Sequence, residues 1–552
     1  MKNLKYIFLS ILSISMIACE NDLVEDIRER NNNSEIETTP ELMVNDVDFS
    51  NYVAIGASFT AGFSDGGLFR ASQERSFPQL LSEQFAFGGG GTFSQPLMDD
   101  NTGGILVGGN VAAGYRLVFG GAGPVPLDAF LASQGAPVPP ITTEAGNNIG
   151  SNFNNFGIPG AKSFHFITPG YAAFNPFYTR IASGATSTVL GDALAQNPTF
   201  FTLSEVGGND VLGYATSGGT GVDQTGNIDP STYGGNDITD PNVFAQAFSQ
   251  MVGALTQNGA KGVVTTVPDI TSLSHFTTVP HNPLDPTNPS FGPQIPTLNG
   301  IFSQLNQVFA FLSVPERSIV FSETSASAVV IRDDSLTDLS AQITQVLLAS
   351  PTFPAFVQSF GLPAAAAPQV AGLLGLVYGQ ARQATANDLL VLPSASVIGT
   401  VNEDFAAFLG SQGLPPTLAG QFSVEGVSLP LEDKWVLSPQ EQNNIAMATA
   451  AYNATIFSVA DSNPNVAVAD LRAVLEQAST SGYPYDDYVM TTDLVFGGLV
   501  SLDGVHLTSR GYGLMAREFL VAIDTTFGTN FIASGTTPVA ADLPTNYSPT
   551  LQ

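Results

Sequence analysis

A serine near the start of the chain and an aspartate–histidine pair near its end have the residue types of a hydrolase with a serine nucleophile. Ser58 follows a short apolar run, and Asp503 precedes His506 by three positions. A serine hydroxyl is a weak nucleophile until a base takes its proton. At this spacing the imidazole can turn back, so that Nδ1–H meets the carboxylate and Nε2 faces outward. We therefore expect Asp503 to orient His506, and His506 to act as base and then as acid.

Two glycine-containing segments between these residues hold the donors that acyl transfer needs. Gly160 lies in the segment 155–161, and Asn209 follows two glycines at 207–208. The backbone N–H groups of Ser58 and Gly160 and the side-chain amide of Asn209 would form an oxyanion hole. Loss of one such donor typically costs about 3 kcal/mol of transition-state stabilisation.

Strands and helices must bring these distant segments together. Apolar runs predict strands and 3.6-residue periodicity predicts helices, and the alternation of the two predicts a parallel sheet covered on both faces. In such sheets, sites lie at the carboxyl ends of strands, and both Ser58 and Asn209 follow predicted strands. The predicted strands comprise residues 52–55, 199–206, 262–267 and 465–471. Helices are predicted over residues 76–87, in a segment that starts with the capping box Ser438–Glu441, and in a last segment that contains Tyr512 and Ile523 and ends at Gly528.

The ordered set of segments resembles the SGNH hydrolases, also called GDSL esterases and lipases. The matching blocks are Gly-Ala-Ser-Phe at 56–59, the glycine segment 155–161, Gly-Gly-Asn-Asp at 207–210 and Asp-Gly-Val-His at 503–506. The resemblance implies a flavodoxin-like three-layer α/β/α sandwich with a parallel sheet, ester substrates and no cofactor. It also implies Ser58 as nucleophile, Gly160 and Asn209 as oxyanion donors, and Asp503 with His506 as the rest of a triad.

The chain departs from the family pattern in two ways. Ala57 and Phe59 stand where the family has Asp and Leu. The triad acid belongs to the last block, so the first departure should alter local hydrogen bonding and leave the mechanism intact. The chain is also longer than a compact family core, which predicts insertions at about 88–150, 211–245, 275–300 and 325–435. The hydrolase domain with these insertions is predicted to span 49–530, followed by a tail at 531–552.

The N-terminus has the pattern of a bacterial lipoprotein signal. Lys2 and Lys5 precede an apolar run at 6–17, and Ala18 leads to Cys19, the only cysteine. This pattern predicts a signal peptide at 1–18 and a lipid-anchored Cys19, which would hold the protein by a lipid anchor outside the cytoplasm, at the outer membrane. The acidic segment 19–48 is predicted to be a solvated tether. Which membrane face carries the anchor is left open.

Composition excludes some partners. The formal net charge is −31, so the chain repels phosphate backbones and no nucleic acid is expected as a partner. Charged residues make up 12%, against about 25% in an average domain. A surface that depends on neutral polar residues suits an extracytoplasmic protein. The oligomeric state is left open.

No metal site is predicted. His165, His275 and His281 lack an aspartate three positions upstream, and the last two lie in a proline-rich segment without a carboxylate cluster. Whether calcium binds the Asp/Asn-rich loops around 223–242 is left open.

Three features have competing interpretations. A second Gly-Gly-Asn-Asp at 234–237 follows no apolar strand, and we predict a loop there. Residues 339–381 contain no Asp, Glu, Lys or Arg; they could form a helical cap over an apolar pocket or, as we favour, the core of an inserted subdomain. Trp435, the only tryptophan, could line a pocket, but a packing role is favoured.

Together these observations predict a serine ester hydrolase of the carboxylesterase or lipase type, with a small-molecule or lipid ester as substrate. One alternative is a carbohydrate acetylesterase. Exposed aromatic residues near Ser58 would favour a sugar substrate, whereas an apolar channel would favour an acyl lipid. Another is a surface binding lipoprotein that has the fold without turnover.

Overall fold

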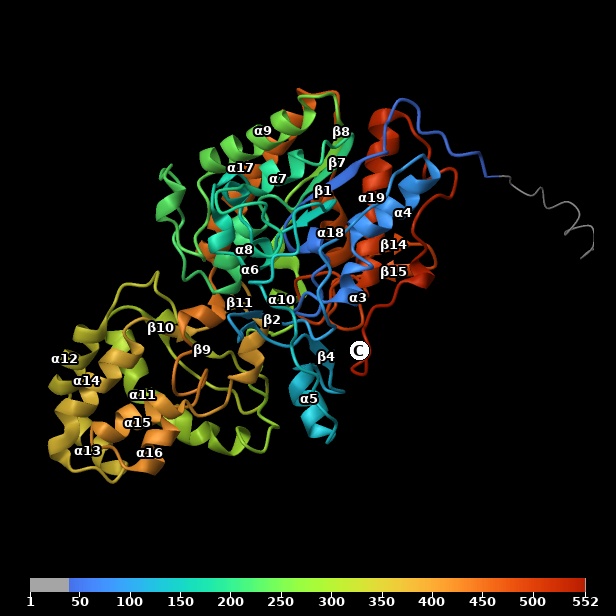
Figure 1. The fold of residues 1–552 in the computed structure, drawn as a ribbon. Helices are drawn as coiled ribbons and strands as arrows, with labels where there is room; N and C mark the ends of the chain where they lie inside the picture. The colour runs from blue at the N-terminus through green and yellow to red at the C-terminus, as the bar shows by residue number, and fades with distance from the viewer. Residues whose placement is uncertain (1–38, 552) are drawn as a thin grey trace, which may run out of the picture.

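The computed structural model describes residues 39–551, and a five-stranded parallel sheet lies at its centre (Figure 1). The chain has an α/β fold. Every residue of two five-residue strands, Tyr52–Gly56 and Phe200–Ser204, is buried, as expected for a parallel sheet covered on both faces. The strands, in their order across the sheet, are β13 (Val466–Ala469), β8 (Lys261–Thr265), β7 (Phe200–Ser204), β1 (Tyr52–Gly56) and β6 (Asn155–Gly157).

Strand β1 and its two neighbours in the sheet end side by side. Gly56, its last residue, pairs with Gly157 of β6 on one side and with Ser204 of β7 on the other. The four predicted strands are confirmed within a few residues at each end. The sequence analysis missed β6, which is only a three-residue strand.

Helices cover both faces of the sheet. On one face, α4 (Phe77–Phe87) packs against α19 (Ser509–Phe527), and on the other α9 (Pro241–Thr256) packs against α17 (Pro439–Asp461) (Figure 1). The three predicted helices are confirmed as α4, α17 and α19. The capping box is present, because Glu441 N donates to Ser438 Oγ at 3.5 Å and Ser438 N donates to Glu441 Oε2 at 2.6 Å. Gly528 ends α19 with a φ of 69°.

Residues 279–436 form a second body beside the sheet domain, with a hydrophobic core of their own (Figure 1). The predicted insertions at 275–300 and 325–435 belong to this one subdomain, because α11 (Ile295–Phe311) packs into the same core. Trp435 packs against both cores. The other helices of the subdomain are α12 (Ser340–Ala349), α13 (Phe353–Ser359), α14 (Ala367–Tyr378), α15 (Glu403–Ser411) and α16 (Pro416–Gln421).

The charge-free stretch 339–381 forms α12 to α14 and places Ile343, Val357 and Ala371 in the second core. It is therefore part of an inserted subdomain's core, the interpretation that the sequence favoured. Within residues 39–551, no single helix is long and apolar enough to cross a membrane. The helices Phe353–Ser359 and Ala364–Tyr378 have the length and composition of a membrane span only when they are taken together, and the chain bends by 114° between them.

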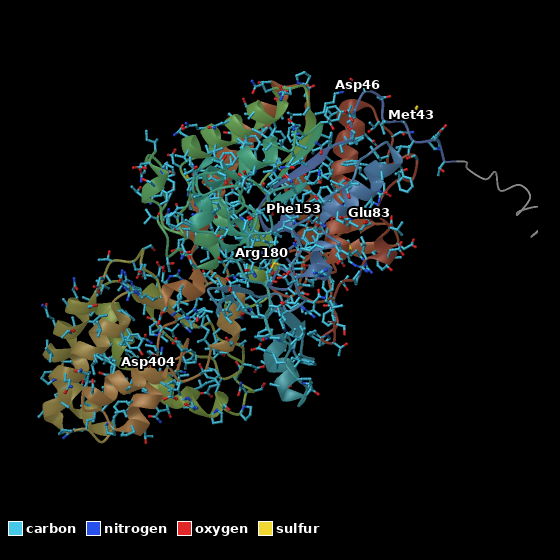
Figure 2. The ribbon with its side chains drawn as sticks, viewed as in Figure 1. Met43, Asp46, Glu83, Phe153, Arg180 and Asp404 are labelled. Atoms are coloured by element: carbon cyan, nitrogen blue, oxygen red, sulfur yellow. The ribbon has the colours of Figure 1, made fainter. Side chains whose placement is uncertain are left out.

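Both ends of the described chain pack on the sheet domain. Val47 is buried, Asn45 Nδ2 donates to the Phe527 and Gly528 carbonyls, and Asp46 pairs with Lys261 at 2.6 Å; Figure 2 shows Met43 and Asp46 at this edge. The last part of the predicted tether is therefore docked. The predicted signal peptide and Cys19 lie outside the described residues.

The predicted C-terminal tail is also packed rather than free. Phe531 and Ala540 are fully buried, and Arg510 Nε donates to the Ala540 carbonyl at 3.0 Å. Tyr547 packs edge-on against Phe69 at a centroid distance of 4.8 Å. Residues 531–551 thus complete the surface around α19.

Candidate active site

Ser58 lies at the carboxyl edge of the sheet, where β1 turns directly into the short helix α2 (Ser58–Ala61). The turn is tight, because a Cβ on Gly56 would lie 2.1 Å from Thr60 Oγ1 and 2.6 Å from the Ser204 carbonyl oxygen. Ser58 is 7% exposed. Within the described chain, neither its hydroxyl nor its backbone N–H makes a hydrogen bond, so both are available to a substrate.

Asp503 and His506 form a hydrogen-bonded pair in the loop that precedes α19. His506 Nδ1 lies 2.7 Å from Asp503 Oδ2, and the other carboxylate oxygen accepts from the backbone N–H groups of Val505 and His506 at 2.9 and 2.8 Å. Burial opposes ionisation of Asp503, but the His506 charge and these hydrogen bonds hold the pKa of Asp503 well below its usual range. The carboxylate is therefore charged at neutral pH and can orient the imidazole.

The loop after α2 ties Ser58 to this pair. Gly66 N donates to Asp503 Oδ2 at 2.8 Å, Asp65 N donates to Ser501 Oγ at 2.9 Å, and Ser64 Oγ donates to the Leu507 carbonyl at 2.9 Å. These bonds bring together residues that are more than 430 positions apart in the sequence.

Aromatic contacts complete the link between His506 and the serine helix. The imidazole lies 4.5 Å from the Phe63 ring and 5.6 Å from the ring of Phe59, the neighbour of Ser58. Within residues 39–551 no hydrogen bond joins the Ser58 hydroxyl to the imidazole. Such contacts are often long in a ligand-free site and tighten when substrate binds.

The predicted oxyanion donors follow the two strands that flank β1. Gly160 has a φ of +79° and its N–H has no partner in the described chain, while Asn209 is the first residue of α8 (Asn209–Thr216). Asn209 Nδ2 donates one hydrogen bond to the Ala161 carbonyl at 3.0 Å, which joins the two loops. One amide hydrogen of Asn209 remains for an oxyanion.

The aspartate of the Gly-Gly-Asn-Asp segment holds the Gly160 loop in place. The fully buried carboxylate of Asp210 accepts from Ser163 N at 2.9 Å and from Ser163 Oγ at 2.7 Å. The second such segment, 234–237, is a loop, as predicted. Lys162 Nζ donates to the Asp237 carbonyl of this loop at 2.6 Å. The loop 234–237 therefore contacts the segment that follows Gly160.

Glu205 is a site residue that the sequence analysis missed. It directly follows β7 with a φ of +53°, and its carboxylate accepts from Phe59 N at 2.9 Å and Thr60 N at 2.8 Å. Burial raises the pKa of Glu205 to about 7, against the lowering effects of these N–H donors and His506. The available signal in the sequence was a single acidic residue directly after the strand residues Phe200–Ser204.

We expect Glu205 to make stability fall with pH. A carboxyl group whose pKa rises from 4.5 to about 7 on folding is protonated in the folded state and ionised in the unfolded state across that window. The free energy of unfolding should therefore drop as pH rises from about 4.5 to 7, by up to roughly 3 kcal/mol relative to Glu205→Gln. Denaturant unfolding of both proteins at pH 5 and pH 8 measures this difference.

The comparison of the two proteins removes the contributions of other groups. Glu476→Gln, a substitution at an exposed position, serves as control and should retain the wild-type dependence. Parallel pH dependence in wild type and Glu205→Gln would contradict the assignment.

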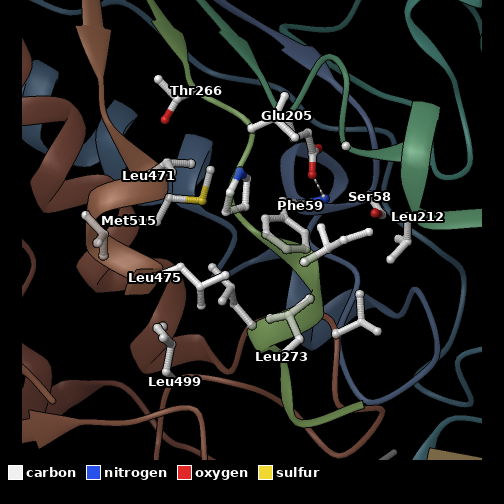
Figure 3. Close-up of a pocket in the computed structure, with 18 of the residues that line it drawn as sticks. Ser58, Phe59, Glu205, Leu212, Thr266, Leu273, Leu471, Leu475, Leu499 and Met515 are labelled. Atoms are coloured by element: carbon white, nitrogen blue, oxygen red, sulfur yellow. Dashed lines mark hydrogen bonds between the residues drawn. The ribbon is translucent and has the colours of Figure 1, made fainter. Parts of the chain in front are cut away.

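An apolar cavity of about 100 Å³ opens beside Ser58 (Figure 3). Ser58 and Glu205 lie at one end of the cavity in Figure 3, Asn209 also lines it, and most other lining residues are aliphatic. Phe59 lies between this polar end and the apolar end formed by Leu471, Leu475 and Met515 (Figure 3). Trp435 is not among the lining residues of this cavity in the described chain.

Two of the other histidines, His165 and His275, have supporting positions. His165 stacks on Tyr171 at a centroid distance of 4.2 Å, and burial, together with Lys162, lowers the pKa of His165 to about 4. His275 N donates to the Gly504 carbonyl at 3.0 Å, and burial lowers its pKa. Across residues 39–551, including 223–242, no three His, Cys, Asp or Glu side chains cluster in a way that could hold a metal ion.

Comparisons of the protein with family models, with curated proteins and with solved structures found no match. Function must therefore be inferred from the groups that meet at the carboxyl edge. Three N–H donor groups, a serine hydroxyl and the hydrogen-bonded pair of the Asp503 carboxylate and His506 lie there beside an apolar cavity. This set of groups suits nucleophilic attack on an acyl carbonyl.

Proposed function

We propose that the protein is a serine ester hydrolase of the carboxylesterase or lipase type. The observation that carries the proposal is the 2.7 Å Asp503–His506 hydrogen bond, held against the loop of the Ser58 helix by Gly66. Numbered along the chain, the five sheet strands have the order 2-1-3-4-5, which is the flavodoxin-like order. This order supports the SGNH-type sandwich that the sequence motifs imply.

In the proposed acylation step, Ser58 Oγ attacks the ester carbonyl carbon and forms a new C–O bond. The Ser58 proton moves to His506 Nε2, and Asp503 stabilises the resulting imidazolium. The carbonyl oxygen becomes an oxyanion that accepts from Ser58 N, Gly160 N and Asn209 Nδ2. When the tetrahedral intermediate collapses, the bond to the alcohol oxygen breaks and His506 gives its proton to the departing alkoxide.

Deacylation repeats these steps with water. His506 Nε2 takes a proton from the water as its oxygen attacks the acyl carbon. The bond to Ser58 Oγ then breaks, and His506 returns the proton to the serine. The products are a carboxylic acid and the free enzyme, and no cofactor takes part.

The lining of the cavity favours an acyl substrate over an acetylated sugar. The walls beside Ser58 are largely aliphatic side chains such as Leu212, Leu273 and Leu475, whereas sugar sites are expected to present aromatic platforms. A binding protein without turnover would not need an oriented Asp–His pair together with free donor groups. These features support the esterase over both alternatives.

We further propose that a lipid on Cys19 anchors the enzyme outside the cytoplasm, at the outer membrane. The support is the sequence pattern at 1–19, which lies outside the described residues. Chain packing on the domain begins near Met43, whose N–H donates to Asn530 Oδ1 at 2.6 Å. About two dozen residues would then separate the anchor from the enzyme.

The proposal predicts covalent labelling of one serine. An alkyl fluorophosphonate should phosphonylate Ser58 Oγ with loss of fluoride, because the triad activates that hydroxyl alone. Mass spectrometry of the peptide that contains Ser58, combined with a p-nitrophenyl butyrate assay, measures both labelling and turnover. A folded protein that neither reacts with the probe nor hydrolyses the ester would contradict the proposed function.

A further inference from the structure

The cavity beside Ser58 has closely packed walls on its far side. Leu475 of α18 (Leu471–Thr480), Leu499 of the loop before α19 and Met515 of α19 are 7%, 4% and 3% exposed. Side chains packed in this way between a sheet and two helices have little freedom to move apart. The cavity therefore has a defined length, which a ligand must match.

The two ends of the cavity differ in chemistry. Ser58 lies at one end (Figure 3), so a carbonyl group bound beside it would direct one of its substituents toward the aliphatic walls. His506, which must protonate the departing alcohol, is not among the residues that line the cavity in the described chain. The alcohol would therefore leave on the His506 side, and the cavity faces the acyl side.

The volume sets the length of the acyl chain. An apolar cavity of about 150 Å³ holds benzene, a molecule of six carbons. By proportion, the present cavity of about 100 Å³ holds about four carbons.

We propose that this cavity is an acyl-chain pocket that selects esters of short fatty acids, with chains of about four carbons. The proposal rests on the proposed esterase function and adds to it the chain length of the substrate. Leu475, Val474 and Phe59 determine the chain length, Leu475 and Val474 as walls and Phe59 as the side chain between the polar and apolar ends.

The pocket predicts a peaked chain-length profile. Each methylene buried in an apolar pocket raises kcat/KM about fourfold until the pocket is full. Butyrate esters should therefore exceed acetate esters about 15-fold, and longer chains, which the far walls obstruct, should lose this advantage. Palmitate esters should be hydrolysed at least tenfold less efficiently than the optimum.

Wall substitutions in the full chain test the inference with a series of p-nitrophenyl esters from acetate to palmitate. Leu475→Ala should move the optimum to chains longer by about two or three carbons, and Val474→Phe, at a half-buried position, should move it toward acetate. Glu476→Gln, on the exposed side of the same helix, is the matched control and should keep the wild-type profile. If Leu475→Ala fails to fold, Val474→Phe still gives the test.

The outcomes separate this inference from the proposed function. Turnover with an unchanged profile in both wall variants, or a wild-type optimum at acetate or palmitate, would overturn the acyl-chain pocket and leave the esterase in place. Absence of turnover on every ester together with absence of fluorophosphonate labelling would overturn both.

Discussion

Replacing Ser58 by alanine should reduce kcat for p-nitrophenyl butyrate by about 10⁶-fold, the effect seen when a triad loses its nucleophile. The variant retains the Asp503–His506 pair and the oxyanion donors but has no atom that can form the acyl-enzyme. The residual rate would come from these donors acting on a bound ester. Steady-state kinetics with wild type and variant measure the effect.

The same substitution should leave stability almost unchanged. Within the described chain the Ser58 hydroxyl makes no hydrogen bond, so its removal leaves no buried group unsatisfied. Ser82→Ala on α4, where Ser82 Oγ donates to the Gln79 carbonyl at 2.7 Å, is the matched control and should keep full activity. A folded Ser58→Ala protein with more than about 1% of wild-type kcat would assign the nucleophile elsewhere.

Asp503→Asn should lower kcat by about 10⁴-fold, because the neutral amide favours the wrong tautomer of the imidazole. In the wild type, Asp503 Oδ2 accepts from both His506 Nδ1 and Gly66 N, and Oδ1 accepts from two backbone N–H groups. An amide NH₂ in this position must face a donor, whichever way it turns. We therefore expect the variant to lose the Nδ1–H contact that directs Nε2 toward Ser58.

The rate of fluorophosphonate labelling should fall with kcat in Asp503→Asn, since both depend on activation of the Ser58 hydroxyl. Asp493→Asn, at an exposed position in the preceding loop, is the control for removal of one negative charge. Its activity should match the wild type. Equal labelling rates in Asp503→Asn and wild type would remove Asp503 from the proposed triad.

A strand of the sheet could be predicted from the sequence where its residues form an apolar run that is long enough to be buried on both faces. This condition holds for β1, β7, β8 and β13. The capping residues of α17 and α19 could also be predicted from the sequence, because a helix cap depends on neighbours within four positions. β6 escaped notice because its three residues include a polar Asn155, whose side-chain amide donates to the Thr60 carbonyl at 2.8 Å. Pairing with β1 makes this segment a strand.

The insertions show the same limit. Residues 339–381 were recognisable as apolar helical sequence, but α11 extends past the predicted boundary at residue 300 and still belongs to the same core. Likewise, the segment 531–551 looked like a tail, and only its contacts with Arg510 and Phe69 show that it is packed. Composition is a local property, whereas membership of a core depends on contacts with distant residues.

The sequence alone determined the residue types of the candidate site, their order along the chain and the short spacing that lets Asp503 bond to His506. Only the tertiary structure brought that pair to the Ser58 helix, added Glu205 beneath it and enclosed the apolar cavity. The bond from Phe59 N to Glu205 spans 146 positions and the bond from Gly66 N to Asp503 spans 437. Contacts at such separations arise because parallel strands align their carboxyl ends at one edge of the sheet. The order of residues along the chain does not show which of the loops at that edge become neighbours.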